Sequence, residues 1–370
     1  MRIDIIGAGI MGLSAAWALH KRGHRIRLFE QGPIPNPLAA SADRHRLIRY
    51  PYGDQDGYVR MVGQAYAAWD ELWTDVGERL QIETGTLAFD TADDDWANRS
   101  RASLDRCAIP YDLLAPAELE RRFPFLASET IGQALYLPSG GVLLAERILA
   151  ALSRHLTGNG VELRANSKVV QIDPAHARLR LTDGGISEAE LLVVAAGPWT
   201  PKLVPGLAGR VTPSRQVVSY LVPPAGYGEA WARAPMILAI GLKAGFYAVP
   251  PVAGLGLKVG DHRFSLQGDP DRERTAGGAE AAAIADQASG WFRDFAAYRL
   301  SEAKTCFYDV ADGEEFIVEP IGPRCWVLSG FSGHGFKFGA ILGNRLAAAI
   351  AGEIPAGALS AWAAGRGIGV

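Results

Sequence analysis

Cysteine is scarce in this chain of 370 residues, which contains only Cys107, Cys306 and Cys325. Three widely spaced cysteines exclude a disulfide framework, and without a CxxC pair we expect no structural zinc and no other metal site. No apolar run reaches the roughly 18 residues of a membrane span, and the first residues lack the layout of a signal peptide. These absences favour a cytoplasmic protein.

An excess of one charge is also missing. The 37 basic and 40 acidic residues leave a formal net charge of −3. This mixed, mildly acidic balance gives no electrostatic reason to expect a nucleic acid or a membrane surface as partner. Without coiled-coil heptads, a monomer and a homodimer are equally compatible with the sequence. We therefore expect the partners to be small molecules.

The length and composition favour a folded protein of two domains. Hydrophobic residues make up 48% and charged residues 21%, as in globular chains. At about 150 residues per domain, the length predicts two domains. The 43 glycines are scattered, so collagen-like and linker-like sequences are excluded.

The first thirty residues carry the clearest local pattern. Residues 3–6 predict a short buried strand, residues 10–22 an amphipathic helix, and residues 25–29 a second strand. A glycine-rich turn between a strand and a helix, followed by a strand with an acidic end, is the context of a dinucleotide-binding unit.

Each residue of this turn has a chemical purpose. Gly7 permits the tight turn, Gly9 lets the backbone approach a pyrophosphate, and Gly12 lets the helix pack closely on the strand. The helix N-terminus attracts phosphates, and Glu30 accepts hydrogen bonds from ribose hydroxyls. The motif predicts a bound dinucleotide but does not separate FAD from NAD.

The rest of the chain alternates between helical and strand patterns. Helices are predicted over residues 58–80, 116–123, 140–155 after an initial turn, 278–297 and 338–351. Strands are predicted over residues 84–90, 161–173 with 177–182 as a hairpin, 190–196, 217–221, 236–240, 245–249, 256–259, 306–308, 316–320 and 325–329. The aromatic residues Tyr66, Trp69 and Trp73 share one helix face, which indicates packing.

These patterns predict an α/β fold with two interleaved domains. The dinucleotide-binding domain is of the Rossmann type, and the substrate domain is of the α+β type, built on an antiparallel sheet. We assign residues 1–80, 145–210 and 300–370 to the first domain, and residues 81–144 and 211–299 to the second.

Five stretches spread along the whole chain carry a family likeness. They are Gly7-x-Gly9-x-x-Gly12 with Glu30; Arg46-Leu47-Ile48-Arg49 with Tyr52-Gly53; Gly256-Leu257-Lys258-x-Gly260 with His262; Lys304-Thr305-Cys306-Phe307-Tyr308 with Phe316-Ile317; and Gly330-Phe331-Ser332-Gly333-His334-Gly335-Phe336-Lys337. With these stretches the sequence resembles the D-amino-acid-oxidase-like flavoproteins, and within them the monomeric sarcosine oxidase, N-methyltryptophan oxidase and pipecolate oxidase group.

The resemblance implies an enzyme that binds FAD and oxidises a secondary amino acid, N-alkyl or cyclic, to the imine while O2 is reduced to hydrogen peroxide. Two alternatives stay open. One is a flavin-dependent amine dehydrogenase that passes electrons to a carrier or a quinone, and the other is a flavin-binding protein with little turnover. An NAD-dependent dehydrogenase is opposed by the stretch 330–337, which such enzymes do not need.

The resemblance also implies residues for the chemistry. Lys258 matches a lysine that activates O2, because a fixed ammonium stabilises the negative charge that forms on oxygen. Arg49 and Lys337 match a clamp for the substrate carboxylate, in which a guanidinium fork is joined by a point charge. The residues that match the lining of the amine site are Tyr247, Tyr308 and His262. The loops at residues 54–58 and 243–246 are expected to set the volume of this site.

A second set is expected to bind the cofactor. Besides the N-terminal motif it comprises Arg46, Val169, Gly197, Gly333, His334, Gly335 and Lys337. Cys306 matches a cysteine that forms a thioether to the flavin, with a buried packing role as the alternative. The stretch 40–43, Ala-Ser-Ala-Asp, replaces a Ser-His-His-Gly stretch of the covalent members, so the matching histidine is absent.

Overall fold

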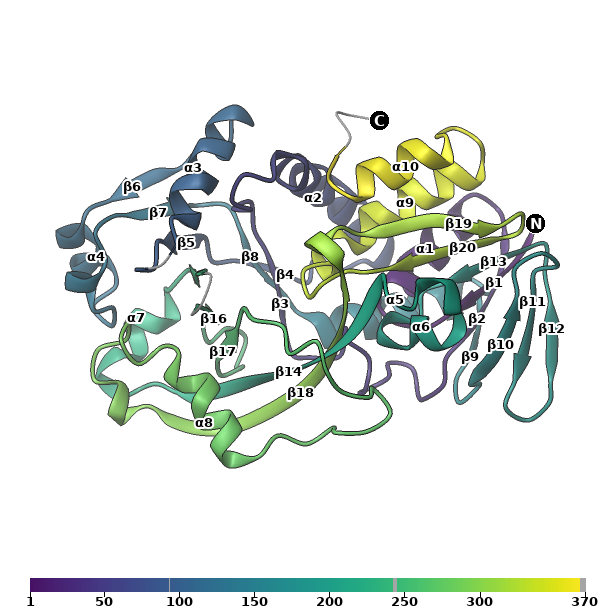
Figure 1. Ribbon diagram of the computed structural model, residues 1–370. Coiled ribbons are helices and arrows are strands. Elements are labelled where there is room, and N and C mark those ends of the chain that lie inside the picture. Colours follow the sequence, from purple (N-terminus) through teal and green to yellow (C-terminus); the bar gives the residue numbers. More distant parts are fainter. Residues whose placement is uncertain (93, 242–244, 367–370) are drawn as a thin grey trace.

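The computed structural model describes residues 1–92, 94–241 and 245–366. Two large sheets dominate it and lie side by side, with the longer strands β14 and β18 at the base of the left half in Figure 1. Helices and sheets of both parallel and antiparallel pairing confirm the predicted mixed α/β class. Within the described ranges, no helix is both long enough and apolar enough to cross a membrane.

The six-stranded sheet has the Rossmann-type arrangement expected from the first thirty residues. Its order is β19 (Ile317–Gly322), β20 (Cys325–Ser329), β13 (Leu191–Val194), β1 (Arg2–Ile6), β2 (Arg25–Phe29) and β9 (Glu162–Arg164). All neighbours pair in parallel except β19 and β20. Ile3 and Ile5 are fully buried, as expected for a parallel strand covered on both faces.

The eight-stranded sheet is the α+β part. Its order is β18 (Arg299–Ala311), β14 (Val211–Val222), β17 (Leu257–Asp261), β16 (Phe246–Val249), β15 (Met236–Ala239), β5 (Thr86–Phe89), β7 (Ala134–Leu137) and β6 (Asp112–Leu114). Its pairing is antiparallel apart from β15 with β5, which is parallel because β5 enters from a distant segment. The division of the chain into two domains stays a prediction, and β18 lies in this sheet although most of it was assigned to the first domain.

Smaller sheets and the helices complete the fold. Two three-stranded sheets are β10 (Val169–Asp173), β11 (Arg178–Leu181), β12 (Ile186–Glu188) and β3 (Arg46–Ile48), β8 (Gly141–Leu143), β4 (Gln81–Glu83). The helices are α1 (Ile10–Lys21), α2 (Asp56–Val76), α3 (Trp96–Arg106), α4 (Pro116–Arg122), α5 (Ala145–Gly158), α6 (Thr200–Leu203), α7 (Gly228–Ala232), α8 (Gly278–Asp286), α9 (Gly339–Ile350) and α10 (Ala356–Ala363).

Two predicted elements differ from the structure. The helix predicted over residues 278–297 ends at Asp286, because Phe292 is pulled into a core of aromatic rings and stacks edge-on against Trp231. The first arm of the hairpin predicted over residues 161–173 and 177–182 is two elements, since a turn with positive φ at Asn166 separates β9 from β10. The hairpin itself is present, because β10 pairs antiparallel with β11. β9 then joins the six-stranded sheet beside β2.

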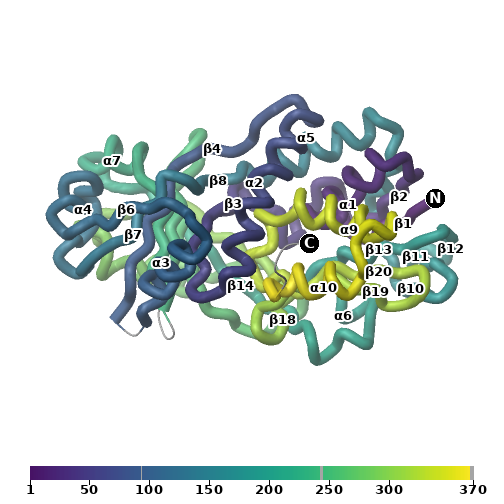
Figure 2. The backbone as a smooth tube through the Cα atoms, turned by 90° about the horizontal axis from the view of Figure 1, so that it is seen from above, coloured from purple at the N-terminus to yellow at the C-terminus, as the bar shows by residue number. Residues whose placement is uncertain are grey.

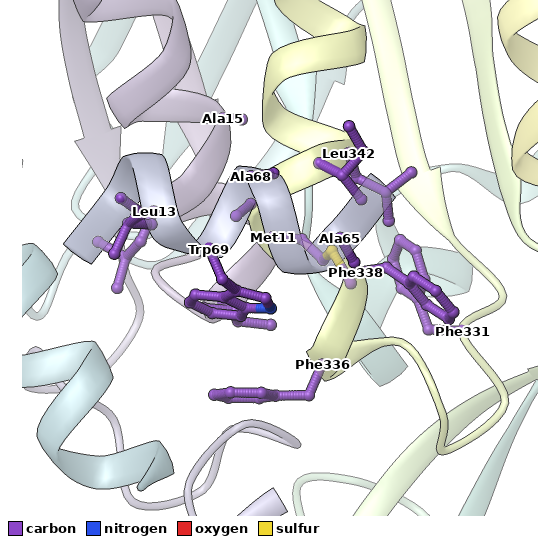
Figure 3. Packing of buried hydrophobic residues seen from close by; sticks show 14 of the residues in the cluster. Met11, Leu13, Ala15, Ala65, Ala68, Trp69, Phe331, Phe336, Phe338 and Leu342 are labelled. Atoms are coloured by element: carbon purple, nitrogen blue, oxygen red, sulfur yellow. The ribbon is translucent and has the colours of Figure 1, made fainter. Parts of the chain in front are cut away.

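The two ends of the chain meet in one half of the molecule, where α1 packs against α9 (Figures 1 and 2). Figure 3 shows Trp69 of α2 above Phe336, which precedes α9, with their rings stacked at 6.3 Å. The Trp69 indole also donates a hydrogen bond of 2.7 Å to the Lys337 carbonyl. The predicted packing role of this helix face is therefore confirmed, and it fixes the segment that carries Lys337.

Candidate active site

A first cavity of about 280 Å³ opens at the end of β1 and contacts the glycine-rich turn. A Cβ at Gly12 would lie 1.8 Å from the Gly7 carbonyl oxygen, so this close packing of helix on turn requires glycine. A Cβ at Gly9 would meet only Ser41 Oγ at 3.2 Å, so Gly9 leaves its cavity side open. Because α1 begins there without an acidic residue in its first turn, its N-terminus is available to an anion.

Glu30 is fixed at the end of β2, beside this turn. It is 5% exposed, and its carboxylate accepts hydrogen bonds from the Ala8 amide at 2.8 Å and the Asn36 side chain at 2.8 Å. Val169 and Gly197 line the same cavity from β10 and from the turn after β13. The residues predicted to bind the cofactor that line this cavity are Gly7, Gly9, Glu30, Arg46, Val169, Gly197, Gly333 and Gly335. Gly12, which packs the helix, does not line it, and neither do Cys306, His334 and Lys337.

A second cavity of about 640 Å³ adjoins the first. All six residues predicted for the chemistry line it: Arg49, Tyr247, Lys258, His262, Tyr308 and Lys337. Four residues line both cavities: Arg46, Tyr308, Gly333 and Phe336. Residues from five separate segments thus converge on one site, since Lys258 and His262 belong to the same stretch, and the shared residues mark where the two cavities meet.

The loop 330–337 forms the wall between the cavities. Gly333 has a φ of +76°, and a Cβ there would lie 2.4 Å from the Tyr308 ring. At Gly335 a Cβ would lie 2.6 Å from the Phe331 side chain. The backbone therefore lies against aromatic side chains at both glycines.

Arg49 and Lys337 lie buried on the wall of the second cavity, 9% and 3% exposed. Among the residues that the structure describes, no carboxylate lies within ion-pair distance of either. The Glu314 carboxylate interacts with the charge of Arg49 from a greater distance, and burial raises the pKa of Glu314 itself. Burial, and then the charge of Arg49, hold the pKa of Lys337 well below its usual range. Two buried cations without an anion form a site for an external anion.

Tyr52 joins these two cations. The Lys337 ammonium donates to the Tyr52 hydroxyl at 2.8 Å, and the Arg49 guanidinium lies 4.5 Å from the centre of the Tyr52 ring. The Tyr52 hydroxyl lies 3.1 Å from Nδ1 of His334, while Nε2 of His334 lies 3.2 Å from the Glu314 carbonyl oxygen. Since burial lowers the pKa of His334, its ring is neutral, donates through Nε2 and accepts at Nδ1. The His334 ring therefore contacts the Tyr52 hydroxyl and orients it relative to Lys337.

The remaining wall of the second cavity combines aromatic rings with charged residues, which are Asp54, Asp94, Arg99, Asp261, Arg263 and Glu314. Tyr247 and Tyr308 stay in their neutral form, since burial raises the pKa of both. Burial also lowers the pKa of His262 to about 4, so this ring is uncharged at neutral pH. The uncharged rings of Tyr247, Tyr308 and His262 suit a neutral amine more than an ammonium.

Lys258, which is buried, and Arg46, which is half-buried, form a second pair of cations near the junction of the cavities. Unlike the first pair, both contact a carboxylate, that of Asp43. Arg46 is 2.5 Å from Oδ2 of Asp43, and Lys258 contacts the same oxygen. Lys258 is 2% exposed, which removes the solvated surface lysine as an interpretation.

Cys306 lies on β18 at 8% exposure and lines neither cavity. It shares a strand face with Tyr308, two residues further on, which lines both. Burial raises the pKa of its thiol, whereas Arg46 and Lys258 act in the opposite direction. Its position beside the junction leaves both the tether and the packing role open.

Sequence reasoning missed Tyr52 and Asp43 as site residues and noted them only as part of longer stretches. Trp96 was missed as well, although it lines the second cavity and lies 5.5 Å from the Arg49 guanidinium. Of the loops expected to set the site volume, Asp54 and Gln55 line the cavity, while residues 242–244 lie outside the described ranges.

The chain matches the family described as DAO, FAD dependent oxidoreductase, over residues 2–349. It is 30% identical to the peroxisomal sarcosine oxidase of Homo sapiens over 352 residues, covering 92% of this chain and 90% of that protein. It is 30% identical to the monomeric sarcosine oxidase of Streptomyces avermitilis over 357 residues, covering 93% and 92%. Among solved structures, glycine oxidase from Geobacillus kaustophilus superposes with a TM-score of 0.83 at 22% identity and full coverage of both chains, which shows the shared fold.

Proposed function

Because the chain belongs to the DAO family of FAD-dependent oxidoreductases, we propose that it oxidises a secondary amino acid, N-alkyl or cyclic, and reduces O2 to hydrogen peroxide. The observation that carries this substrate class is the pair Arg49 and Lys337, two buried cations that face the second cavity without a carboxylate of their own. The similarity to sarcosine oxidases supports the same class. Since these relatives are oxidases, they favour neither the dehydrogenase nor the flavin-binding alternative.

The first cavity fits the FAD dinucleotide. Gly9 leaves the N-terminus of α1 open to it, and the Glu30 carboxylate is placed for ribose hydroxyls. The flavin end would reach the junction formed by Arg46, Tyr308 and Gly333. When bound, FAD supplies the two-electron acceptor for the oxidation.

The protein residues bind and orient the amino acid. Arg49 and Lys337 hold its carboxylate, and this fixes the carbon next to nitrogen relative to the junction. The neutral rings of Tyr247, Tyr308 and His262 favour the uncharged amine, whose nitrogen lone pair assists loss of a hydride equivalent from the neighbouring carbon. The product is an imine, which water hydrolyses after release. Lys258 then stabilises the negative charge that forms on O2 as the electrons pass to it.

Cys306 is the proposed covalent attachment point of the flavin. Its support is its place on β18, beside the junction and on the same strand face as Tyr308. If the thioether forms, acid precipitation leaves the yellow colour in the pellet, and Cys306→Ser moves it to the supernatant. Yellow colour that leaves wild-type protein on acid treatment contradicts the attachment.

The substrate class is tested by anaerobic mixing with matched pairs of amines. The cyclic amino acids pipecolate and proline, and sarcosine with further N-methyl amino acids, are each compared with the amine that lacks the carboxylate, such as piperidine for pipecolate. The proposal expects bleaching of the flavin band by one or more of the acids but not by its counterpart, and one equivalent of peroxide when air restores the colour. Failure of every acid to bleach, or equal bleaching by acid and counterpart, contradicts it.

A further inference from the structure

Asp43 occupies the centre of the cation cluster at the junction, and no part of the proposed reaction uses it. Its side chain is 5% exposed. Four donors surround its carboxylate. The Arg44 amide at 2.8 Å and the Arg46 guanidinium at 2.5 Å come from its own segment, and the Tyr220 hydroxyl at 2.5 Å and the Lys258 ammonium come from distant strands. Burying an ionised carboxylate costs free energy, so the buried Asp43 carboxylate requires compensating interactions with positive charges.

Strand register explains why these donors meet. Tyr220 on β14 and Lys258 on β17 are direct cross-strand partners, so their side chains leave the sheet on the same face. Asp43 reaches them from the segment before β3, and Arg46 begins that strand. Asp43 therefore links the eight-stranded sheet to the segment that carries both arginines of the site.

The charges around Lys258 do not balance without Asp43. The titratable and charged groups that surround it are Asp43, His45 and Arg46 at the start of β3, Tyr220 on β14, Tyr247 on β16, and Lys304 and Cys306 on β18. Among these, Asp43 is the one carboxylate. His45 cannot replace it, since its ring has no hydrogen-bond partner among the described residues and burial lowers its pKa to about 3.

Because one of the two cations is an arginine and the other a lysine, Arg46 and Lys258 would respond differently to loss of the Asp43 carboxylate. Arginine keeps its proton in proteins, whereas a buried lysine readily loses its own. Burial already lowers the pKa of Lys258, and the charge of Arg46 lowers it further, while Asp43 opposes both effects. Removing the carboxylate would leave the positive charges of Arg46 and Lys258 close together without a compensating negative charge. Lys258 would lose its proton, because this removes the repulsion between the two charges.

We propose that Asp43 is a positioning residue that keeps Lys258 protonated and holds its ammonium at the junction of the two cavities. Its consequence for oxygen reduction rests on the proposed function of Lys258. The charge-holding role itself depends only on the contacts of Asp43 and is testable without any amine substrate.

The first test follows reoxidation by O2 of protein reduced chemically with dithionite, as a function of pH. Lys258 supports the reaction in its protonated form, so the rate is present below the pKa of Lys258 and falls as the pH rises through it. In Asp43→Asn this fall is expected about 1 to 3 pH units lower than in wild type, the range for loss of an adjacent opposite charge. Asp43→Glu, which keeps the anion, is expected to restore the wild-type profile.

The matched control is Asp4→Asn. Asp4 is also a buried carboxylate paired to an arginine, with Arg27 at 2.8 Å, but it lies outside both cavities. This variant is expected to lose stability and to keep the wild-type pH profile. Where Lys258→Met slows reoxidation, an Asp43→Asn profile that coincides with wild type overturns the proposal.

The second test needs no turnover. Urea unfolding of the FAD-loaded protein is measured for Asp43→Asn, Lys258→Met and the double variant. If the carboxylate and the ammonium stabilise each other, the double variant loses less stability than the two single losses added together. Additive losses overturn the counter-ion role. If Asp43→Asn alone fails to fold, recovery of folding in the double variant supports the proposal, and continued failure overturns it.

The two tests separate this proposal from the proposed function. Reoxidation that Lys258→Met leaves unchanged contradicts the role of Lys258 in oxygen reduction, and the unfolding measurements then decide the role of Asp43. Reoxidation that is slowed in Lys258→Met, together with a shifted profile in Asp43→Asn, supports both.

Discussion

The second cavity has two pairs of cations on its wall, each of one arginine and one lysine, and they differ in one respect. Arg46 and Lys258 share the carboxylate of Asp43, whereas Arg49 and Lys337 have no ion-pair partner among the described residues. The protein balances the first pair internally and leaves the second pair to an external anion. Despite this shared composition, the two pairs serve different purposes. The first pair presents a fixed charge, and the second pair binds a carboxylate.

The largest expected effect comes from breaking the unbalanced pair. Arg49→Ala removes the guanidinium fork, and losing one partner of a buried charge pair costs about 2 to 5 kcal/mol. The rate of flavin reduction per substrate concentration is therefore expected to fall by roughly 30-fold to several thousand-fold. Single-turnover reduction measured by stopped flow checks this. Arg99→Ala is the control, since Arg99 lies at the same cavity but pairs with Asp94 at 2.6 Å, and it is expected to stay within a few fold of wild type.

Stability provides the second contrast between the pairs. Asp43→Asn leaves two cations uncompensated and is expected to lower the free energy of unfolding by about 3 to 5 kcal/mol. Lys337→Met removes an uncompensated cation instead, and is expected to raise it by about 1 kcal/mol while activity is lost. Urea unfolding at neutral pH without substrate measures both. Equal losses in the two variants contradict the distinction between the pairs.

A smaller effect is expected from Tyr52→Phe. This change keeps the ring beside Arg49 but removes the hydroxyl that accepts from Lys337, and a hydrogen bond to a charged group is worth about 1.5 to 3 kcal/mol. Substrate binding is expected to weaken by roughly 10-fold. Tyr58→Phe is the matched control, because Tyr58 does not line the cavity and its hydroxyl contacts the Glu314 carbonyl and the Phe316 amide instead of Lys337. Equal effects of the two changes would mean that Tyr52 acts only by packing.

The smallest effect concerns pH. A simple carboxylate such as propionate has no amine, so the pH dependence of its binding reports on the protein. Lys337 is charged below its pKa, which burial lowers, and binding is therefore full at low pH and weakens as the pH rises through that value. We expect a several-fold weakening toward alkaline pH and a flat profile in Lys337→Met. A wild-type profile that is already flat contradicts the contribution of Lys337.

Much of the fold and of the site follows from local sequence patterns. The turn at Gly7, Gly9 and Gly12 is readable because strand, turn and helix are contiguous. The cations of the site stand in stretches that resemble a known family, and the structure brings them to one cavity. Patterns of this kind identify residues of the site without showing how they are paired.

The pairing depends on contacts between distant segments. Asp43 meets Tyr220 and Lys258 across 177 and 215 residues, a relation set by the register of β14 and β17. Tyr52 contacts Lys337 across 285 residues. The helix predicted to continue to residue 297 ended early for a similar reason, since the burial of Phe292 outweighed local helix propensity.

The most direct measurement compares propionate with propionamide as ligands of the FAD-loaded protein. Binding of each ligand is monitored through the change that it causes in the flavin absorption. The two ligands have nearly the same shape and differ in charge. If Arg49 and Lys337 form a carboxylate site, propionate binds saturably, propionamide does not, and the Arg49→Ala/Lys337→Met double variant loses the difference. Equal binding of propionate and propionamide to the wild-type protein would contradict the account.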